Sequence, residues 1–367
     1  MKFTCKRSEL SETVNNISRA VAQKSENAHL DCAKLYLDGN RLTFSGYDLN
    51  LGIMRTIEVE SEDHGQVLLN AKLLTDIVRK LPNEKVTAVI DENLKCTITS
   101  GNTVYDIPAL SADEYPSLPE VEKSDFFEFE QSVMKSMIEQ TIYAVAVTDN
   151  KPILKGELFD IEDGVFNLVA IDGFRLAIRT EPIKTEDRFN FVVMGKALSE
   201  LSKLINENSD KKMTVYVSKK HVSFDLGDYT LVARLLEGEF HKYKGSIPKK
   251  FNTYATVNTK QLSDVLERCM LIIVEQTKAP ARCSFKDGKI SVNVSTPMGI
   301  FNDELPVEME GSSLEIGFNS RYLMEALKAA GTDKVKFSLG VPTSPLMITP
   351  LDGDQFTFLV LPVRLKN

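Results

Sequence analysis

The sequence of 367 residues repeats one pattern of segments three times, with copies about a third of the chain apart. When the chain is aligned with itself, Lys72 matches Lys196 and Arg321, and Asn70 matches Asn319. Each copy must therefore be able to form the same supersecondary unit. This repeat constrains the fold more than any other feature of the chain.

The segments that precede these helices repeat as well. A short strand followed by a helix is expected around Leu10, Met134 and Leu262, which occupy matching positions. Alternating apolar residues after the helices, such as Val86 and Ile90, predict half-buried antiparallel strands. Each third of the chain then holds two half-units of β-α-β-β-β order.

Helix boundaries follow from local chemistry. The spacing of Leu73, Ile77 and Leu81 predicts an apolar helix face, and Pro82 and Gly331 are expected to end helices. Side chains at three predicted helix starts can accept the unpaired backbone N–H groups: Asn70, Thr259 and Asn319.

These elements predict an α+β fold of three tandem domains, each with two helices packed on antiparallel sheet. Segments rich in Pro, Gly and charge at 111–125 and 237–250 mark the linkers. We place the domains at residues 1–123, 124–247 and 248–367.

Composition excludes several classes of protein. The 44 basic residues against 52 acidic ones give a net charge of −8, which argues against a polybasic wrapper of nucleic acid. The five cysteines form no C-x-x-C, so they are interpreted as reduced core thiols. The histidines lack metal-ligand spacing, and we expect no metal, no cofactor and no membrane span. The N-terminal segment has no signal-peptide pattern, which favours a cytoplasmic protein.

No catalytic motif is present, whether a phosphate loop, a nucleophile elbow or a zinc-binding H-E-x-x-H. Carboxylates close in sequence, including Asp160, Asp163 and Asp352, are interpreted as turn residues beside glycine. The segment 170–179 predicts a tight Asp172–Gly173 turn with an exposed apolar lip and one cation, Arg175. Such a lip suits a peptide better than a reaction, although an enzyme with a site near Asp172 and Arg175 stays an alternative.

Basic residues recur in register on the repeated helices. Cations seven residues apart lie on one helical face, and three such pairs are Lys72 with Arg79, Lys196 with Lys203, and Arg321 with Lys328. Charges on helices are usually only solvated faces. Three pairs in register instead indicate sequence-independent contacts with phosphates.

The segments MKFT, DEYPSLP, IDGFRLA, EGEFHKY and LPVRL, in this order along the repeats, resemble the beta sliding clamps of bacterial DNA polymerase III. The resemblance covers the whole length. It implies a non-catalytic processivity factor with the DNA clamp fold. Its members are head-to-tail homodimers that form a ring around duplex DNA, slide along it and tether the replicative polymerase.

The resemblance also implies site residues. Residues expected to face DNA are Lys24, Lys72, Arg79, Lys196, Lys203, Arg321 and Lys328. The dimer seam would join Tyr105 and Ile107 to Leu271 and Ile272. An apolar cleft would bind short motifs of the polymerase III catalytic subunit, the clamp loader, other polymerases and repair proteins; its expected lining is Leu154, Ile171, Gly173, Phe174, Arg175, Leu176, Asn319, Tyr322, Leu361, Pro362, Val363, Arg364 and Leu365.

The sequence departs from the common family pattern in places, and Lys366 and Asn367 extend past the usual terminus. Phe174 stands where many members have His, His241 where many have Pro, and Gly245 where a basic residue is frequent. These differences affect which peptides the cleft prefers. A specialised clamp paralogue from a mobile element or resistance locus therefore stays open beside the housekeeping form.

Overall fold

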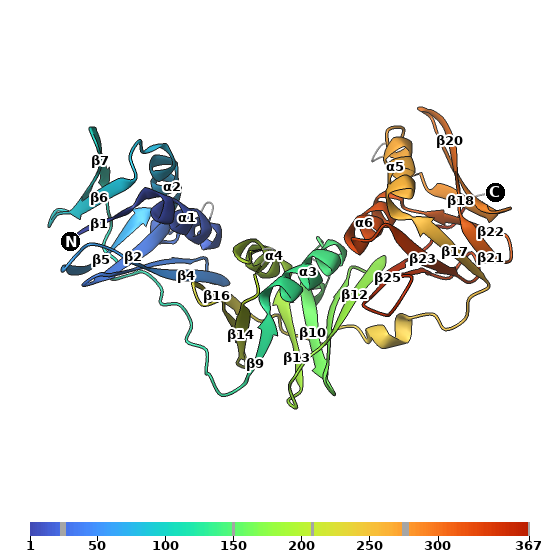
Figure 1. Ribbon diagram of the computed structural model, residues 1–367, viewed down its shortest axis with the longest axis horizontal. Helices are drawn as coiled ribbons and strands as arrows, with labels where there is room; N and C mark the ends of the chain where they lie inside the picture. Colours follow the sequence, from blue (N-terminus) through green and yellow to red (C-terminus); the bar gives the residue numbers. More distant parts are fainter. Residues whose placement is uncertain (23–26, 149–150, 207–208, 274–278, 366–367) are drawn as a thin grey trace. The chain divides into compact units, whose positions relative to one another are not determined.

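The computed structural model describes residues 1–22, 27–148, 151–206, 209–273 and 279–365 (Figure 1). The chain divides into two compact units. The first comprises Met1–Ser132 and Glu200–Leu235, and the second comprises Val133–Ser199 and Leu236–Asn367. The middle third of the sequence thus contributes to both units.

The order of the elements confirms the six predicted half-units. The first third contains β1 (Lys2–Lys6), α1 (Arg7–Ile17), β2 (Cys32–Asp38), β3 (Arg41–Tyr47) and β4 (Leu51–Glu58), then β5 (His64–Asn70), α2 (Ala71–Lys80), β6 (Lys85–Ile90), β7 (Lys95–Ser100) and β8 (Thr103–Pro108). The middle third contains β9 (Phe126–Glu130), α3 (Gln131–Thr141), β10 (Gly156–Glu162), β11 (Val165–Ile171) and β12 (Arg175–Pro182), then β13 (Phe189–Met194), α4 (Gly195–Leu204), β14 (Lys212–Val217), β15 (His221–Asp225) and β16 (Tyr229–Arg234). The last third contains β17 (Thr253–Asn258), α5 (Thr259–Met270), β18 (Ala281–Lys286), β19 (Lys289–Thr296) and β20 (Gly299–Pro306), the additional β21 (Glu308–Gly311), then β22 (Leu314–Phe318), α6 (Ser320–Ala330), β23 (Lys334–Leu339), β24 (Leu346–Thr349) and β25 (Phe356–Val360).

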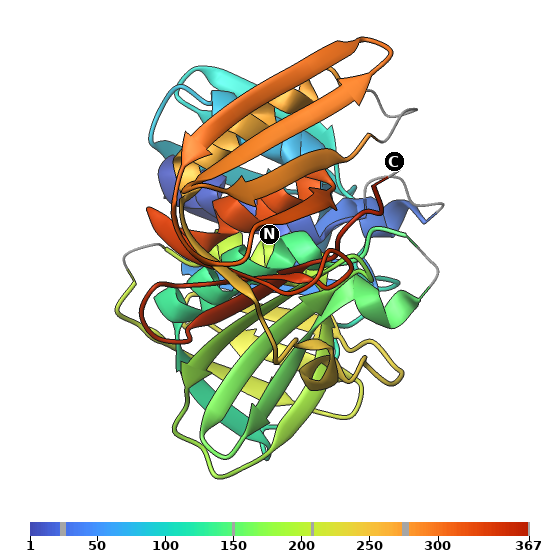
Figure 2. The same cartoon turned by 90° about the vertical axis from the view of Figure 1, so that its right-hand side faces the viewer.

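Antiparallel pairing across the borders of the repeats explains why the units differ from the thirds of the sequence. In the first unit, β4 pairs with β16 in an eight-stranded sheet of order β5-β2-β3-β4-β16-β15-β14-β9. In the second, β12 pairs with β25 in a nine-stranded sheet of order β13-β10-β11-β12-β25-β24-β23-β17-β21. Each unit also has a four-stranded sheet, of order β1-β6-β7-β8 in the first unit and β20-β19-β18-β22 in the second. The β19–β20 hairpin of the second sheet, drawn in orange, lies at the edge of its unit (Figure 2).

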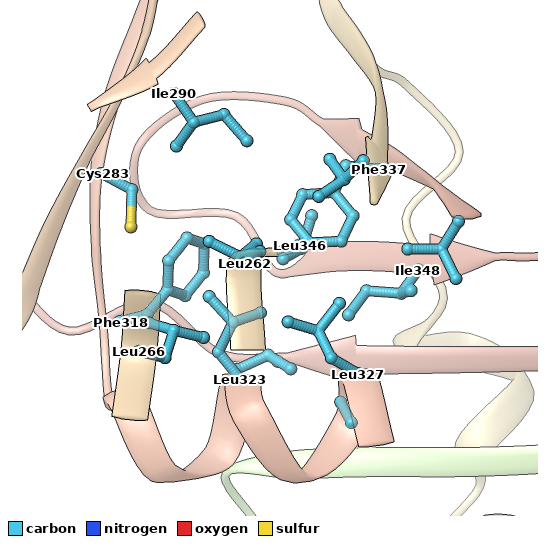
Figure 3. Close-up of a cluster of buried hydrophobic side chains, with 14 of the residues drawn as sticks. Leu262, Leu266, Cys283, Ile290, Phe318, Leu323, Leu327, Phe337, Leu346 and Ile348 are labelled. Atoms are coloured by element: carbon cyan, nitrogen blue, oxygen red, sulfur yellow. The ribbon is translucent and has the colours of Figure 1, made fainter. Parts of the chain in front are cut away.

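Paired helices bury their apolar faces against these sheets. In the second unit, α5 lies beside α6 (Figure 1), and Leu262 and Leu266 of α5 meet Leu323 and Leu327 of α6 over Phe337 (Figure 3). Each fully buried leucine contributes about 1.5–3 kcal/mol relative to exposure. The opposite faces of these helices remain free for charged residues.

The structure corrects two details of the predicted helices. The buried face of α2 is formed by Leu74, Ile77 and Val78, whereas Leu73 is 41% exposed because it lies one position off that stripe. Helix α5 is capped by Asn258, whose side chain accepts from the Gln261 N–H at 2.9 Å. The Thr259 hydroxyl instead donates to the Thr332 carbonyl, so it is not the cap. The predicted caps Asn70 and Asn319 are confirmed.

Asp160 is not a turn residue as predicted. It lies in β10, where its carboxylate accepts hydrogen bonds from the Tyr243 hydroxyl at 2.6 Å and from Asn190, and pairs with Lys244 at 3.1 Å. Burial raises its pKa, but these bonds outweigh burial and hold the pKa below its usual range. The linker between the middle and last thirds is therefore attached to β10. Asp163 does form a turn, at φ 53° before Gly164.

All five cysteines are buried and none forms a disulfide, as predicted. Burial raises the pKa of the Cys5 thiol to about 12. Within the described residues, no cluster of His, Cys, Asp and Glu side chains could hold a metal ion. No helix in the same part of the chain is long and apolar enough to cross a bilayer.

Glu157 in β10 is fully buried, and its carboxyl lies 2.7 Å from the Thr141 hydroxyl. Burial raises its pKa from 4.5 to about 8, although the hydrogen bond with Thr141 opposes the shift. The Thr141 hydroxyl also lies 2.8 Å from the Met137 carbonyl, and its single proton can serve only one acceptor. Thr141 donates to the ionised carboxylate, whereas a protonated Glu157 can donate to Thr141 and leave the Thr141 proton to the Met137 carbonyl.

We predict that Glu157→Gln stabilises the protein increasingly as pH rises. The folded carboxyl stays protonated where the unfolded one is ionised, so wild-type stability falls by about 1.4 kcal/mol per pH unit from roughly 4.5 to 8. The variant should gain roughly 5 °C in melting temperature over wild type at pH 8.5 but little at pH 5. Glu92→Gln, on an exposed turn, is the control. Equal shifts at both pH values would show that Glu157 does not titrate in this range.

Candidate functional site

The second unit contains a cavity of about 770 Å³ beside the β11–β12 turn. Six residues predicted for the cleft line it: Leu154, Ile171, Gly173, Arg175, Leu176 and Leu361. His241, noted above as a departure from the family pattern, also lines it. Sequence reasoning missed the rest of the lining, which is Lys151, Ile153, Glu239, Phe240, Lys242, Ser246, Pro345 and Leu359. Many of these belong to the linker that Asp160 holds against β10, a placement with no signal in the local sequence.

The turn beside the cavity is built by Asp172. Its Oδ1 accepts from the backbone N–H groups of Phe174 and Arg175 at 2.9 and 3.0 Å. Gly173 has φ 90°, in the left-handed region that favours glycine. The predicted hairpin turn is therefore confirmed, and it holds Phe174 outward with its side chain 58% exposed.

Arg175 is buried, which corrects the expectation of an exposed lip with one cation. Its guanidinium pairs with Asp172 at 2.9 Å and with Glu325 of α6. Its guanidinium carbon lies over the ring of Tyr143, 5.3 Å from the centroid, and over that of Tyr322, 4.5 Å from the centroid. Burial lowers the pKa of Arg175, but Glu325 and Asp172 outweigh burial and raise it above the ordinary value. The exposed lip is formed by Phe174, which stacks on Tyr322 at 5.9 Å.

The C-terminal segment crosses the same region. The Leu361 N–H donates to the Phe174 carbonyl at 2.9 Å, and the Val363 N–H donates to the Gly317 carbonyl at 2.8 Å. A Cβ on Gly317 would lie 2.6 Å from the Val363 carbonyl oxygen and from Leu365. Glycine at this position therefore allows the tail to lie against β22.

The other predicted cleft residues lie outside the lining of the cavity. They are Phe174, Asn319, Tyr322, Pro362, Val363, Arg364 and Leu365. The Asn319 side chain is occupied as the cap of α6, where it accepts from the Arg321 N–H at 3.0 Å.

The predicted cation pairs all lie on exposed positions of their helices. Lys203 pairs with Glu200 at 2.8 Å and Lys328 with Glu267 at 2.6 Å, so part of this charge is locally balanced. Lys24 lies outside the described residues. Arg79 also lines a polar hollow of about 390 Å³ between α1 and α2, whose other residues, missed from sequence, are Arg7, Ser8, Ser11, Glu12, Asn15 and Thr75.

Two four-stranded sheets end in strands with no partner on their outer side among the described residues, β8 and β20. On β8, Val104 is 57% and Tyr105 37% exposed, whereas Ile107 points into its own core at 7%. Near β20, Leu271 is 84% exposed and Ile272 is half-buried. Met298 and Ile300, 70% and 73% exposed, extend this apolar edge and were missed by sequence reasoning.

Three tandem domains built from paired β-α-β-β-β half-units define the class of DNA clamps. Three family models match: the N-terminal, central and C-terminal domains of the DNA polymerase III beta subunit, over residues 1–119, 128–242 and 244–364. The chain belongs to this family, the beta sliding clamps.

Individual relatives agree with this assignment. The beta sliding clamp of Halalkalibacterium halodurans is 32% identical over 99% of this chain and 100% of its own length. The clamp of Synechococcus elongatus is 32% identical over 100% of both chains. The crystal structure of the Bacillus subtilis DNA polymerase sliding clamp matches with a TM-score of 0.95 and 27% identity over 100% of both chains.

The family assignment confirms the predicted fold class and the resemblance. Beta sliding clamps are non-catalytic processivity subunits in DNA replication. The alternative of an enzyme near Asp172 and Arg175 is wrong on this ground. The roles of the individual site residues stay predictions.

We predict that Gly317→Ala releases the C-terminal tail from β22, because the added Cβ meets backbone at 2.6 Å. Hydrogen exchange at the Val363 amide should speed up at least roughly tenfold while exchange in β23 stays unchanged. Gly245→Ala, where a Cβ has open space, is the matched control. Equal protection of Val363 in both variants would contradict this role of Gly317.

Proposed function

We propose that two copies of this chain close head to tail into a ring that encircles duplex DNA and slides along it. The observation that carries the proposal is the register of exposed cations on α2, α4 and α6 in a chain of net charge −8. Charge segregated onto equivalent helices is what a ring needs, with its basic surface inside and its acidic excess outside. The clamp domains proposed for this ring are residues 1–123, 124–247 and 248–367.

The contacts with DNA are proposed to be loose and directed at phosphates. The exposed residues are long lysines and arginines without interleaved aromatic rings, which suits phosphates rather than base edges. Ion pairs such as Lys328 with Glu267 weaken each contact further. A ring retains DNA by topology, so weak contacts favour sliding. The proposed set is Lys24, Lys72, Arg79, Lys196, Lys203, Arg321 and Lys328.

The seam of the ring is proposed to join β8 of one copy to β20 of the other. Both strands have a free edge, and such edges need a partner or protection from aggregation. Tyr105 and Leu271 supply apolar surface on the two sides. Ile107 and Ile272 support them from positions that are buried or half-buried in their own units.

The cavity in the second unit is proposed to bind short peptide motifs of replication proteins. Its apolar lining of Leu154, Ile171, Leu176 and Leu361 suits a few aliphatic or aromatic anchors. The proposed partners are the polymerase III catalytic subunit, the clamp loader, other polymerases and repair proteins, in the bacterial cytoplasm. Phe174 and His241 at the cleft keep a specialised paralogue open as the second candidate.

Retention on DNA of different topology tests the ring. The protein is loaded by a clamp loader onto nicked circular DNA, which is then linearised. We expect the protein to stay on the circle and to leave the linear form within minutes, because only the circle has no ends. Equal persistence on both forms would count against topological binding.

Two variants separate the parts of this prediction. Lys72→Glu with Lys196→Glu should lower loading roughly tenfold near 0.15 M salt, since phosphate contacts are salt-dependent. Leu271→Asp should yield monomers in sedimentation and no retention on circles. Normal loading of both variants onto DNA would contradict the proposed DNA-facing residues and the proposed dimer interface.

Truncation after Val360 tests the cleft, since it removes Leu361 and the tail. We expect binding of a fluorescent peptide from the polymerase III catalytic subunit to drop at least roughly a hundredfold, because the peptide loses one wall of its pocket. The dimer should survive in sedimentation. Unchanged peptide affinity would exclude the cleft as the binding site.

A further inference from the structure

Arg175 is held by two carboxylates beside the cavity. Its Nε donates to Asp172 Oδ2 at 2.9 Å and its Nη1 donates to Glu325, so two of its five N–H donors already bind acids. The guanidinium carbon lies 4.5 Å from the ring centroid of Tyr322 and 5.3 Å from that of Tyr143. The side chain is 8% exposed. A ligand carboxylate would therefore meet a cation that two acids of the protein already balance.

The same contacts connect the separate elements of the cleft wall. Glu325 and Tyr322 belong to α6, whereas Asp172 and Arg175 belong to the β11–β12 turn. Phe174 of that turn stacks on Tyr322 and accepts the N–H of Leu361, the first residue of the tail. Arg175 therefore connects the turn to the helix, and Phe174 connects the same turn to the helix and the tail.

The two carboxylates that pair with Arg175 differ in their separation from it along the sequence. Asp172 lies three residues from Arg175 and would pair with it in the isolated turn, but Glu325 is 150 residues away. Of these two ion pairs, only the Glu325 pair connects α6 to the turn. Loss of Glu325 leaves Arg175 paired with Asp172 of its own turn, so α6 loses its ion pair to the turn at a site where Arg175 is buried.

We propose that Arg175 and Glu325 are positioning residues of the cleft, whose ion pair holds α6 against the β11–β12 turn in the arrangement that accepts a peptide. The cleft then recognises apolar anchors at this wall and does not read ligand charge through Arg175. This inference rests on the proposed peptide-binding function.

Glu325→Gln tests the positioning role, because Glu325 does not line the cavity. We expect the full-length variant to bind the fluorescent polymerase peptide roughly tenfold more weakly. Glu181→Gln is the matched control, since Glu181 pairs with the buried Arg179 on the same strand but away from the cavity. The control should lose melting temperature like Glu325→Gln while keeping its peptide affinity. Glu325→Asp, which keeps a carboxylate, should recover part of the loss.

A pair of peptides tests whether Arg175 reads charge. One is the polymerase peptide with an acidic residue added beside its apolar anchors, and the other carries the corresponding amide. With Arg175→Lys, positioning predicts an equal loss of affinity for both peptides. A loss confined to the acidic peptide would mean that Arg175 contacts the ligand and would overturn the proposal.

Failure of this inference can be distinguished from failure of the proposed function. If wild type binds the peptides and Glu325→Gln binds them equally well, the positioning role falls and the cleft function stands. If wild type binds neither peptide, both the proposed peptide-binding function of the cleft and this inference are wrong.

Discussion

Antiparallel pairing between strands that lie far apart in the sequence organises this protein. β4 joins β16 in the first unit and β12 joins β25 in the second, so each large sheet crosses a border between repeats. Backbone hydrogen bonds of this kind close sheet edges that each domain would otherwise expose. Among the described residues, β8 and β20 of the four-stranded sheets have no strand partner on their outer side. The pairing therefore decides the extent of the two compact units.

The β12–β25 pairing also creates the cleft. It places the β11–β12 turn next to the residues that follow β25, so that the Leu361 N–H reaches the Phe174 carbonyl. The linker held by Asp160 supplies the opposite rim. Arg175 joins the β11–β12 turn to α6 by pairing with Glu325. A mainly apolar cavity follows from these contacts, with the charged residues Lys151, Glu239 and Lys242 also in its lining.

The packing of helices and sheets also decides which charged groups are exposed and which are buried. The helices bury one face against the sheets, which leaves the opposite face to cations such as Lys72 and Arg321. The net charge of −8 is a sum over the whole chain, so it does not exclude a local group of cations. The same burial makes Glu157 an uncharged core group at neutral pH, with its pKa raised to about 8.

The sequence by itself determined the six half-units, the basic pairs and the turn at Asp172, because helical periodicity and turn chemistry are local properties. Those local rules also placed the caps at Asn70 and Asn319 correctly, and they failed at Thr259, where the preceding Asn258 caps instead. Only the tertiary structure decided that Arg175 is buried, that Asp160 anchors a linker, and that Ile107 points inward while Ile300 is exposed. These outcomes depend on partners far apart in the chain, such as Glu325 for Arg175, and no local pattern specifies which distant strand or helix a segment will meet.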